Sequence, residues 1–274
     1  MTVCDKCQGR AIIYQRYSGM HLCQAHFDQD VHRKVRESLR HSSLFGRGAR
    51  VAVGLGGGRS SATLLYILKN LFSRRRDIDL LAIIIDEGQE GRAALEEARA
   101  LAGRLAVPCV VKSLSPASGA NLPDLALAKK AFSCGSSFAL KKDLLERAAR
   151  EMEASVLATG HSLDDEALDI FISYLQGDVD GLFRLGLGEG QVPWIKPLRR
   201  IPEREIRLYA IAHGLGSLDS HSQVEPLRAE AKRLLDGFDL RHPGTKYSLL
   251  RSLERVLALK EAGCHSSPPR GQSL

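Results

Sequence analysis

The chain has 274 residues and a mass of 30.0 kDa, and its 39 basic and 32 acidic side chains give a formal charge of +7. A content of 44% hydrophobic and 26% charged residues is ordinary for a globular protein and excludes a wholly disordered or fibrous chain. Because no run of about 18 apolar residues is present and the first residues lack an apolar signal core, we expect neither a membrane span nor secretion.

Three of the six cysteines lie within the first 23 residues. Cys4 and Cys7 form one pair, and after fifteen intervening residues Cys23 and His26 form a second pair of the same spacing. Two such pairs place three thiolates and one imidazole around zinc, and since protein fills all four positions the ion is structural. We predict a zinc-binding module over residues 1–27 in a reducing cytoplasm, because a secreted disulfide framework distributes its cysteines differently. Two unconnected, reduced knuckles are the alternative.

Helical and strand patterns alternate along the rest of the chain. The spacing of Val31, Val35 and Leu39 predicts a basic linking helix within residues 28–48, whose charged face is either solvated or in contact with phosphates. Apolar strands are then expected at 49–55, 80–85, 107–111 and 155–158, and helices at 62–72, 92–105, 139–152 and from Asp164 onward. Continuously apolar strands that alternate with helices indicate an α/β domain with a doubly wound parallel sheet.

This α/β domain is expected to cover residues 49–222, followed by a helical region over 223–262 and a disordered tail over 263–274. Within it, a helix is expected to begin at Pro202 or Glu203. Cys109 is expected to be a buried residue of the third strand.

A glycine-rich loop follows the first strand and opens a helix. Its residues are Gly54, Gly56, Gly57, Gly58, Arg59, Ser60 and Ser61. Free backbone N–H groups and the positive end of the helix favour phosphate, glycine permits its close approach, and the serine hydroxyls add donors. Neither a Walker loop nor a dinucleotide-binding fingerprint is present. The loop therefore predicts a phosphate site, and a tight strand–helix turn without a ligand is the alternative.

A second polar loop, Thr159-Gly160-His161, follows the fourth strand and leads to Asp164 and Asp165. Because the carboxyl ends of parallel strands meet at one edge of a sheet, this loop is expected beside the glycine loop. Adjacent carboxylates near a polyphosphate suit Mg²⁺, which prefers oxygen ligands. An ordinary helix cap is the alternative for Asp164, and both interpretations hold if one carboxylate caps the helix while the other faces the site.

Together these motifs resemble the tRNA 2-thiolation enzymes of the PP-loop ATP pyrophosphatase superfamily, of the archaeal and thermophile thiouridine-synthetase type. The resemblance covers residues 3–262 and includes three further segments, at 85–88, 196–203 and 243–246. It implies that ATP and Mg²⁺ bind at the PP-loop and that a tRNA uridine is adenylated with release of pyrophosphate. Sulfur then displaces AMP. The implied partner is tRNA, and the implied cofactors are ATP, Mg²⁺ and Zn²⁺.

The resemblance also implies roles for individual residues. The seven residues of the glycine loop would form the PP-loop, and Asp86 would lie near the adenosine. Gly160 and Asp165 would complete the nucleotide site, with Asp165 also catalytic. Lys141 stands where a basic residue is usual, and Cys134 stands at a position that handles sulfur in the family.

The chain departs from the family pattern at several positions. Where the family loop has serine, lysine and aspartate, this chain has Gly56, Arg59 and Ser60. Only Cys134 matches the family's three sulfur-handling cysteines, and one thiolate cannot hold a three-cysteine iron–sulfur cluster. Three interpretations stay open. The first is an ATP-dependent tRNA sulfurtransferase, with sulfur supplied by a carrier protein if needed, and the second is a catalytically impaired paralogue that binds tRNA and nucleotide beside an active thiolase. The third is an enzyme that uses the PP-loop for another adenylation, with sulfur or nitrogen supplied by a partner. A homodimer or a heterodimer with a paralogue is compatible with the first two.

The positive charge is concentrated in short stretches rather than spread evenly. Phosphate contacts from lysine and arginine dominate the affinity of proteins for RNA. The candidate stretches of an RNA-facing surface are 33–40, 74–76, 141–142 and 199–200.

Overall fold

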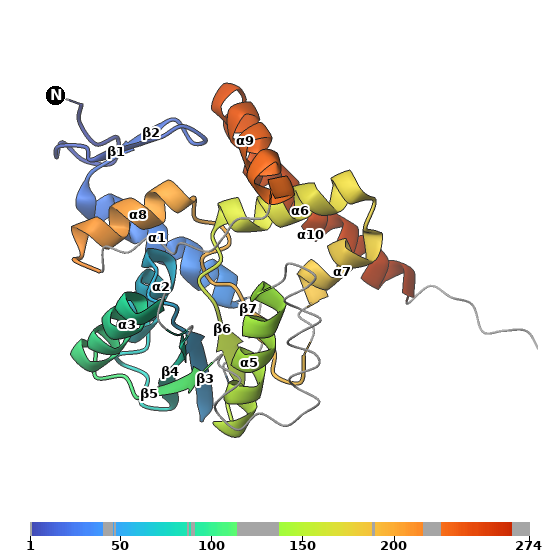
Figure 1. Cartoon of the computed structure of the whole chain (residues 1–274). Coiled ribbons are helices and arrows are strands. Elements are labelled where there is room, and N and C mark those ends of the chain that lie inside the picture. The colour runs from blue at the N-terminus through green and yellow to red at the C-terminus, as the bar shows by residue number, and fades with distance from the viewer. Residues whose placement is uncertain are drawn as a thin grey trace, which may run out of the picture.

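A parallel sheet of five strands forms the centre of the computed structural model, which describes residues 2–40, 46, 48–86, 88, 91–113, 137–187, 190–215 and 226–264 (Figure 1). In chain order the strands are β3 (Ala49–Gly54), β4 (Ile78–Asp86), β5 (Cys109–Ser113), β6 (Val156–Ala158) and β7 (Trp194–Ile195). All neighbouring strands pair in parallel. The predicted α/β fold with a parallel sheet is confirmed.

The order of strands across the sheet is β5-β4-β3-β6-β7. The chain therefore runs outward from β3 to β5 and then returns to the other side of β3 to form β6 and β7. Val53 of β3 pairs with Ala82 of β4 on one side and with Ala158 of β6 on the other. Ligands of open α/β sheets bind at the carboxyl ends of the two strands between which the order reverses. Here this point is the end of β3 beside the end of β6.

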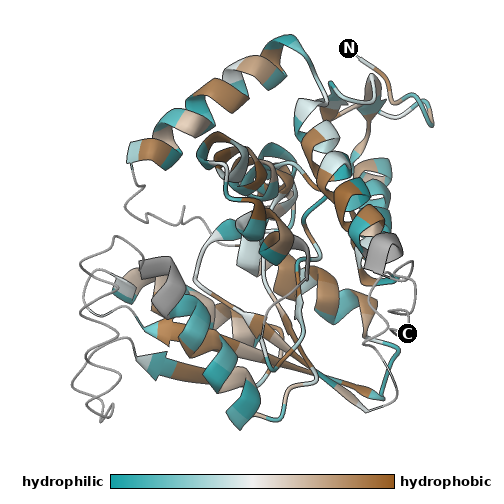
Figure 2. Ribbon diagram, turned by 90° about the vertical axis from the view of Figure 1, so that its right-hand side faces the viewer, coloured by the Kyte–Doolittle hydropathy of each residue, from teal (hydrophilic) through white to brown (hydrophobic). Residues whose placement is uncertain are grey.

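Helices cover both faces of the sheet because side chains alternate along each strand. Val51 and Val53 belong to a large core shared with one group of helices, whereas Ala52 belongs to a second core with Ala148 and Ala149. The first group comprises α1 (Gln24–Arg40), α2 (Arg59–Leu71), α3 (Arg92–Arg104) and α8 (Glu203–Ala212), and α5 (Ser137–Glu151) covers the opposite face. Figure 2 shows the strands mostly in the brown of hydrophobic residues, as burial on both faces requires.

A short antiparallel hairpin of β1 (Ile13–Gln15) and β2 (Met20–Leu22) precedes the first helix. Helix α1 spans Gln24–Arg40 and so begins four residues before the start expected at residue 28. The backbone N–H of Phe27 donates to the Cys23 carbonyl at 2.9 Å, so the helix starts directly behind the second cysteine knuckle.

The chain ends in a layer of helices beyond the sheet (Figure 1). These are α6 (Leu163–Gln176), α7 (Val179–Leu187), α9 (Pro226–Arg241) and α10 (Thr245–Cys264), which share two small cores. The described part of the helical region expected over 223–262 thus contains two helices, α9 and α10. They are separated where Pro243 precedes Gly244, whose φ of +98° is costly for other residues. In the described residues no helix is both long and apolar enough to cross a bilayer.

The expectation that Cys109 is buried is wrong, because its side chain is exposed. Cys109 is the first residue of β5, which among the strands that the structure describes lies at the edge of the sheet and pairs only with β4. The strand also begins two residues later than expected, directly after Pro108, which has no N–H to donate to a ladder. Apolar sequence alone does not distinguish an edge strand from a central one.

Candidate nucleotide site and metal centre

Four metal-ligating side chains converge between the N-terminal hairpin and the start of α1. The ligand atoms of Cys4, Cys7, Cys23 and His26 lie within 4.8 Å of one another. Cys7 Sγ is 3.7 Å from Cys23 Sγ, and His26 Nδ1 is 3.4 Å from Cys4 Sγ and 3.3 Å from Cys23 Sγ. Zinc bonds of about 2.0–2.3 Å to nitrogen and sulfur place tetrahedral ligand atoms at about this separation. The predicted ligand set is therefore brought together and could hold a metal ion.

The backbone around Cys4 favours its thiolate form. Burial opposes ionisation, but hydrogen bonds from the backbone N–H groups of Cys23, Lys6 and Cys7 outweigh it and lower the pKa of Cys4 to about 6. Thiolate, not thiol, is the form that ligates metal ions.

The glycine loop joins the end of β3 to the start of α2. The N-cap residue of α2 is Gly58, which has no side chain to cap the first N–H groups of the helix. The Ser61 hydroxyl donates to the Gly58 carbonyl at 3.0 Å and accepts from the Gly56 N–H at 3.3 Å, which closes the loop on itself. Gly57 has φ +74°, and a Cβ there would lie 2.4 Å from the Ala94 carbonyl oxygen. Only glycine fits this position, because the start of α3 packs directly against it.

The second polar loop packs against the glycine loop. A Cβ on Gly160 would lie 2.8 Å from the Ser60 carbonyl carbon and from the Ser61 nitrogen. Since both atoms belong to the backbone, the loops touch without intervening side chains. The two motifs, about 100 residues apart in the sequence, thus meet where the strand order reverses.

Trp194, a residue that the sequence analysis does not single out, holds this second loop. Its indole N–H donates to the Thr159 hydroxyl at 2.7 Å, and that hydroxyl lies 2.9 Å from His161 Nδ1. The Lys142 ammonium sits over the indole ring, 5.4 Å from its centroid. Burial lowers the pKa of His161, which favours the neutral imidazole. Trp194 is the only tryptophan of the chain and lies two residues before Lys196. This position is the one signal in the sequence that could have indicated a role for Trp194.

The two carboxylates at the start of α6 have different partners. Ser162 caps the helix, and Asp165 Oδ2 accepts from the Ser162 N–H at 2.8 Å and from its hydroxyl at 2.7 Å. Asp164 accepts from the Glu203 N–H at 2.7 Å and pairs with the Lys246 ammonium. The capping residue is therefore Ser162, assisted by Asp165, whereas Asp164 connects α6 to the 243–246 segment.

A buried ionic cluster connects α6 to the 196–203 segment. Glu166 is 2% exposed and pairs with Lys196 at 2.5 Å and with Arg199 at 3.3 Å. Helix α8 begins at Glu203 directly after Pro202, as expected from the sequence.

The other candidate residues lie as follows. Asp86 ends β4 at the same edge of the sheet, where its Oδ1 accepts from the Gly88 N–H at 2.9 Å. Lys141 lies in the second turn of α5 and is half-buried. Cys134 lies outside the described residues.

The basic stretches do not form one continuous face. Residues 74–76 precede β4 and so lie at the amino-terminal edge of the sheet, opposite the glycine loop. Lys34 is 6% exposed and pairs with Asp30 at 2.9 Å and with Glu205 at 3.2 Å. The interpretation of Lys34 as part of a solvated or phosphate-binding helix face is therefore wrong, because two buried carboxylates neutralise it.

Comparison with known proteins agrees with this geometry. Residues 3–28 match the family model described as the N-terminal LIM domain of the 2-thiouridine synthetase TtuA, and residues 27–225 match the model of the PP-loop domain. The second match alone covers more than half of the chain, including both loops of the candidate site.

Individual relatives extend the similarity over nearly the whole chain. The chain is 32% identical to the tRNA 2-thiolation protein NcsA of Haloferax volcanii, with 93% of this chain and 87% of the relative covered. It is 31% identical to cytoplasmic tRNA 2-thiolation protein 1 of Caenorhabditis elegans, with 93% and 71% covered.

Among solved structures, the chain is similar to the U34-tRNA thiolase NcsA of Methanococcus maripaludis with its 4Fe–4S cluster. The TM-score is 0.82 at 29% identity, with 94% of this chain and 89% of that chain covered. The parallel sheet with its glycine loop, the N-terminal cysteine cluster and these similarities over nearly the whole chain lead to one assignment: the chain belongs to the PP-loop family of tRNA 2-thiolation proteins.

Proposed function

We propose that the protein binds ATP at the carboxyl edge of the sheet, adenylates a tRNA uridine and then exchanges its oxygen for sulfur. The uridine O2 attacks the α-phosphorus of ATP and pyrophosphate leaves; a sulfur nucleophile then attacks C2, and AMP leaves with the original oxygen. The observation that carries this proposal is the direct packing of Gly160 against the backbone of Ser60 and Ser61, which supports one nucleotide site formed by both loops. A phosphate there would meet the N–H groups at the start of α2, where the N-cap residue is a glycine without a capping side chain.

The contacts of the two carboxylates divide their proposed roles. Both oxygens of Asp164 are occupied, by Lys246 and by the Glu203 N–H. Asp165 uses Oδ2 in the cap, and in the part of the chain that the structure describes its Oδ1 has no hydrogen-bond partner. We therefore assign Mg²⁺ to Asp165 rather than to Asp164. When bound, Mg²⁺ neutralises charge on the departing pyrophosphate.

Other residues would bind the phosphates or the base. Arg59 and the hydroxyls of Ser60 and Ser61 would hold phosphate oxygens, although an arginine fork replaces the lysine of the family. Lys141, at the start of α5, would approach the α-phosphate, and Asp86 would lie near the adenosine. Cys134 is the candidate to handle sulfur.

The thiols of the chain fit zinc better than an iron–sulfur cluster. Three cysteines converge with His26 in the N-terminal cluster. Of the others, Cys109 lies at the amino end of an edge strand, which leaves Cys134 and Cys264. The three thiolates of a family-type cluster are thus not available in this chain. Sulfur delivered by a carrier protein in the cytoplasm would relax this need.

The metal assignment predicts one zinc ion per chain in the purified protein, measured by elemental analysis. Cys23→Ala is expected to lose most of the zinc, because three ligands remain and the hairpin depends on the ion for its structure. Cys109→Ala is the matched control, since it removes an exposed thiol outside the cluster, and its zinc content should not change. Full zinc occupancy in Cys23→Ala, or iron in place of zinc, would contradict the assignment.

The activity is tested by incubating the purified protein with unmodified tRNA, ATP, Mg²⁺ and sulfide, followed by mass spectrometry of the nucleosides. We expect 2-thiouridine together with AMP and pyrophosphate. The variant Gly56→Ser/Arg59→Lys/Ser60→Asp restores the family loop, and open space around Gly56 accommodates the new side chain. It is expected to turn over faster, by tenfold or more, because it regains a carboxylate and a compact ammonium.

The same assay tests the alternative. An impaired paralogue would bind tRNA and ATP without forming 2-thiouridine, with or without the restored loop. The relatives reported above, each named for tRNA 2-thiolation or as a thiolase, do not favour this alternative.

A further inference from the structure

A cavity of about 480 Å³ lies apart from the PP-loop, between the N-terminal hairpin and the C-terminal helices. Its walls come from the hairpin turn, the start of α6, the start of α8, the end of α9 and the start of α10. Its volume is within the range of pockets that hold a ligand of nucleotide size. The activity proposed above assigns no role to this space.

Lysines and carboxylates inside the cavity are paired with one another. Lys246 lies between Asp164 and Asp236, and Lys232 contacts Glu203 at 3.3 Å. The fourth carboxylate, Asp239, accepts from backbone N–H groups of Gly244 and Lys246. The four carboxylates outnumber the two lysines, so these groups by themselves leave the interior with an excess of negative charge.

The arginines of the cavity differ, because two of them donate to neutral groups. Arg16 Nη2 donates to the Leu240 carbonyl at 2.7 Å, and Arg204 Nη2 donates to the Tyr14 carbonyl. Both side chains belong to exposed residues that line the cavity. A carbonyl orients a guanidinium without cancelling its charge, so these two cations remain available to an anion at the mouth.

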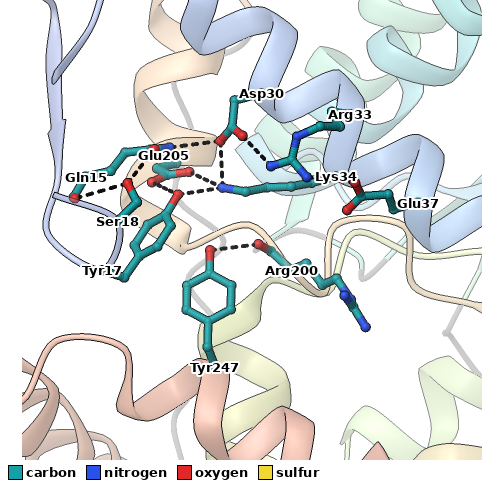
Figure 3. Close-up of polar contacts among 10 residues, drawn as sticks. All are labelled: Gln15, Tyr17, Ser18, Asp30, Arg33, Lys34, Glu37, Arg200, Glu205 and Tyr247. Atoms are coloured by element: carbon teal, nitrogen blue, oxygen red, sulfur yellow. Dashed lines mark hydrogen bonds and ion pairs between the residues drawn. The ribbon is translucent and has the colours of Figure 1, made fainter. Parts of the chain in front are cut away.

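Two aromatic rings form part of the wall. Tyr17 of the hairpin and Tyr247 of α10 have ring centroids 4.7 Å apart. Figure 3 shows how they are held: Tyr17 donates to Glu205 at 2.9 Å and accepts from Lys34, whereas Tyr247 donates to the Arg200 carbonyl at 3.0 Å. The buried side chains of Glu205 and Lys34 hold the Tyr17 ring, and the Arg200 carbonyl holds the Tyr247 ring.

The cavity is also connected to the candidate nucleotide site. Gly160 contacts the PP-loop backbone, and four residues later Asp164 lines the cavity and pairs with Lys246. A strand of RNA anchored in the cavity would thus lie beside the element that completes the nucleotide site.

We propose that this cavity receives one unstacked nucleotide of the RNA substrate, with its phosphate on Arg16 and Arg204 and its base against Tyr17 and Tyr247. The proposal rests on the proposed function, because it assumes that RNA is the substrate. Arginine at a phosphate and an aromatic wall for a base are the usual means of holding single-stranded RNA. The anchored nucleotide is distinct from the uridine that is modified at the PP-loop.

The test compares two double variants that each remove two positive charges. Arg16→Ala/Arg204→Ala alters the mouth of the cavity, and Arg74→Ala/Arg76→Ala alters the opposite edge of the sheet. Binding of tRNA is measured by fluorescence anisotropy over a range of salt concentrations, and binding of ATP by calorimetry. We expect the cavity variant to bind tRNA about tenfold more weakly, with the slope of log K against log salt reduced by about 1 to 2. ATP affinity should stay unchanged in both variants.

Further arms separate the possible outcomes. Arg16→Lys/Arg204→Lys keeps the charges and should recover most of the tRNA affinity, which shows that a loosened hairpin is not the cause. If the cavity variant binds tRNA as the control does, the cavity proposal is wrong while the proposed function stands. If the wild-type protein binds no tRNA, both are wrong. Binding of free CMP that is lost in the cavity variant, with tRNA binding intact, would identify a free nucleotide instead of RNA.

Discussion

Replacing Gly160 with alanine is expected to weaken the binding of ATP by about tenfold or more, because the second loop can no longer touch the PP-loop. The added Cβ would lie 2.8 Å from the Ser60 carbonyl carbon and the Ser61 nitrogen, and neither backbone atom can rotate away as a side chain would. The loops must separate by several tenths of an ångström, and such overpacking costs about 1–3 kcal/mol. A loss of 1.4 kcal/mol in binding corresponds to a factor of about ten.

Calorimetry with ATP and Mg²⁺ measures this effect, and chemical denaturation shows how much of it is loss of stability. Gly103→Ala is the matched control, since Gly103 lies in α3 and an added Cβ there meets nothing within 4 Å. Alanine should leave ATP binding unchanged there and stabilise the helix by about 0.5–1 kcal/mol. Equal ATP affinity in Gly160→Ala and the wild type would show that the two loops do not form one site.

Replacing Lys34 with methionine is expected to lower the free energy of unfolding by about 3–5 kcal/mol, because it leaves the buried Glu205 carboxylate without its cation and removes one of the two cations beside Asp30. The side chains of Lys34 and Glu205 are 7% and 0% exposed, and their charged atoms lie 3.2 Å apart. Tyr17 would lose a donor in the same change. Urea denaturation followed by circular dichroism measures the difference.

Two further variants make this prediction specific to a buried pair. Arg75→Met removes one partner of an exposed pair with Asp77, for which we expect a loss of at most about 1 kcal/mol. Lys34→Met/Glu205→Leu replaces both partners of the buried pair and should recover part of the loss, since apolar groups carry no desolvation cost. If Lys34→Met unfolds no more easily than Arg75→Met, the buried pair contributes no more to the free energy of unfolding than the exposed pair does.

The same cluster determines how stability depends on pH. Burial opposes ionisation of Asp30, but the Lys34 ammonium outweighs it and lowers the pKa of Asp30 to about 2. A lowered carboxyl pKa contributes stability that is fully present above the ordinary value of 3.8 and is lost as the pH falls through about 2. In Lys34→Met the pKa of Asp30 should rise, so this contribution would be absent from that acidic range.

Several features followed from local patterns in the sequence. The sequence predicts one cluster of Cys4, Cys7, Cys23 and His26, because the short spacing within each of the two pairs brings the side chains of that pair together. The glycine loop and the Thr159–His161 loop were placed at one edge because carboxyl ends of parallel strands always share an edge. The family followed from the order of these motifs along the chain, which is itself a property of sequence.

Other features depended on contacts between residues far apart in the sequence. The order of the strands depends on pairing between segments that are distant in the sequence. The same holds for the ion pair of Asp164 with Lys246 and for the hydrogen bond from Trp194 to Thr159. The exposure of Cys109 and the burial of Lys34 contradicted their local patterns for the same reason.

Sequence by itself determined the type of fold, the family and the residues that could ligate metal, because periodicity and short spacings act within a few residues. Only the tertiary structure decided that Asp164 joins Lys246, and that a cavity with charged arginines lies beside this pair. Burial, ion pairing and cavities arise where separate elements meet. Their free energies depend on which side chain from another element fills the space, and no local pattern encodes that.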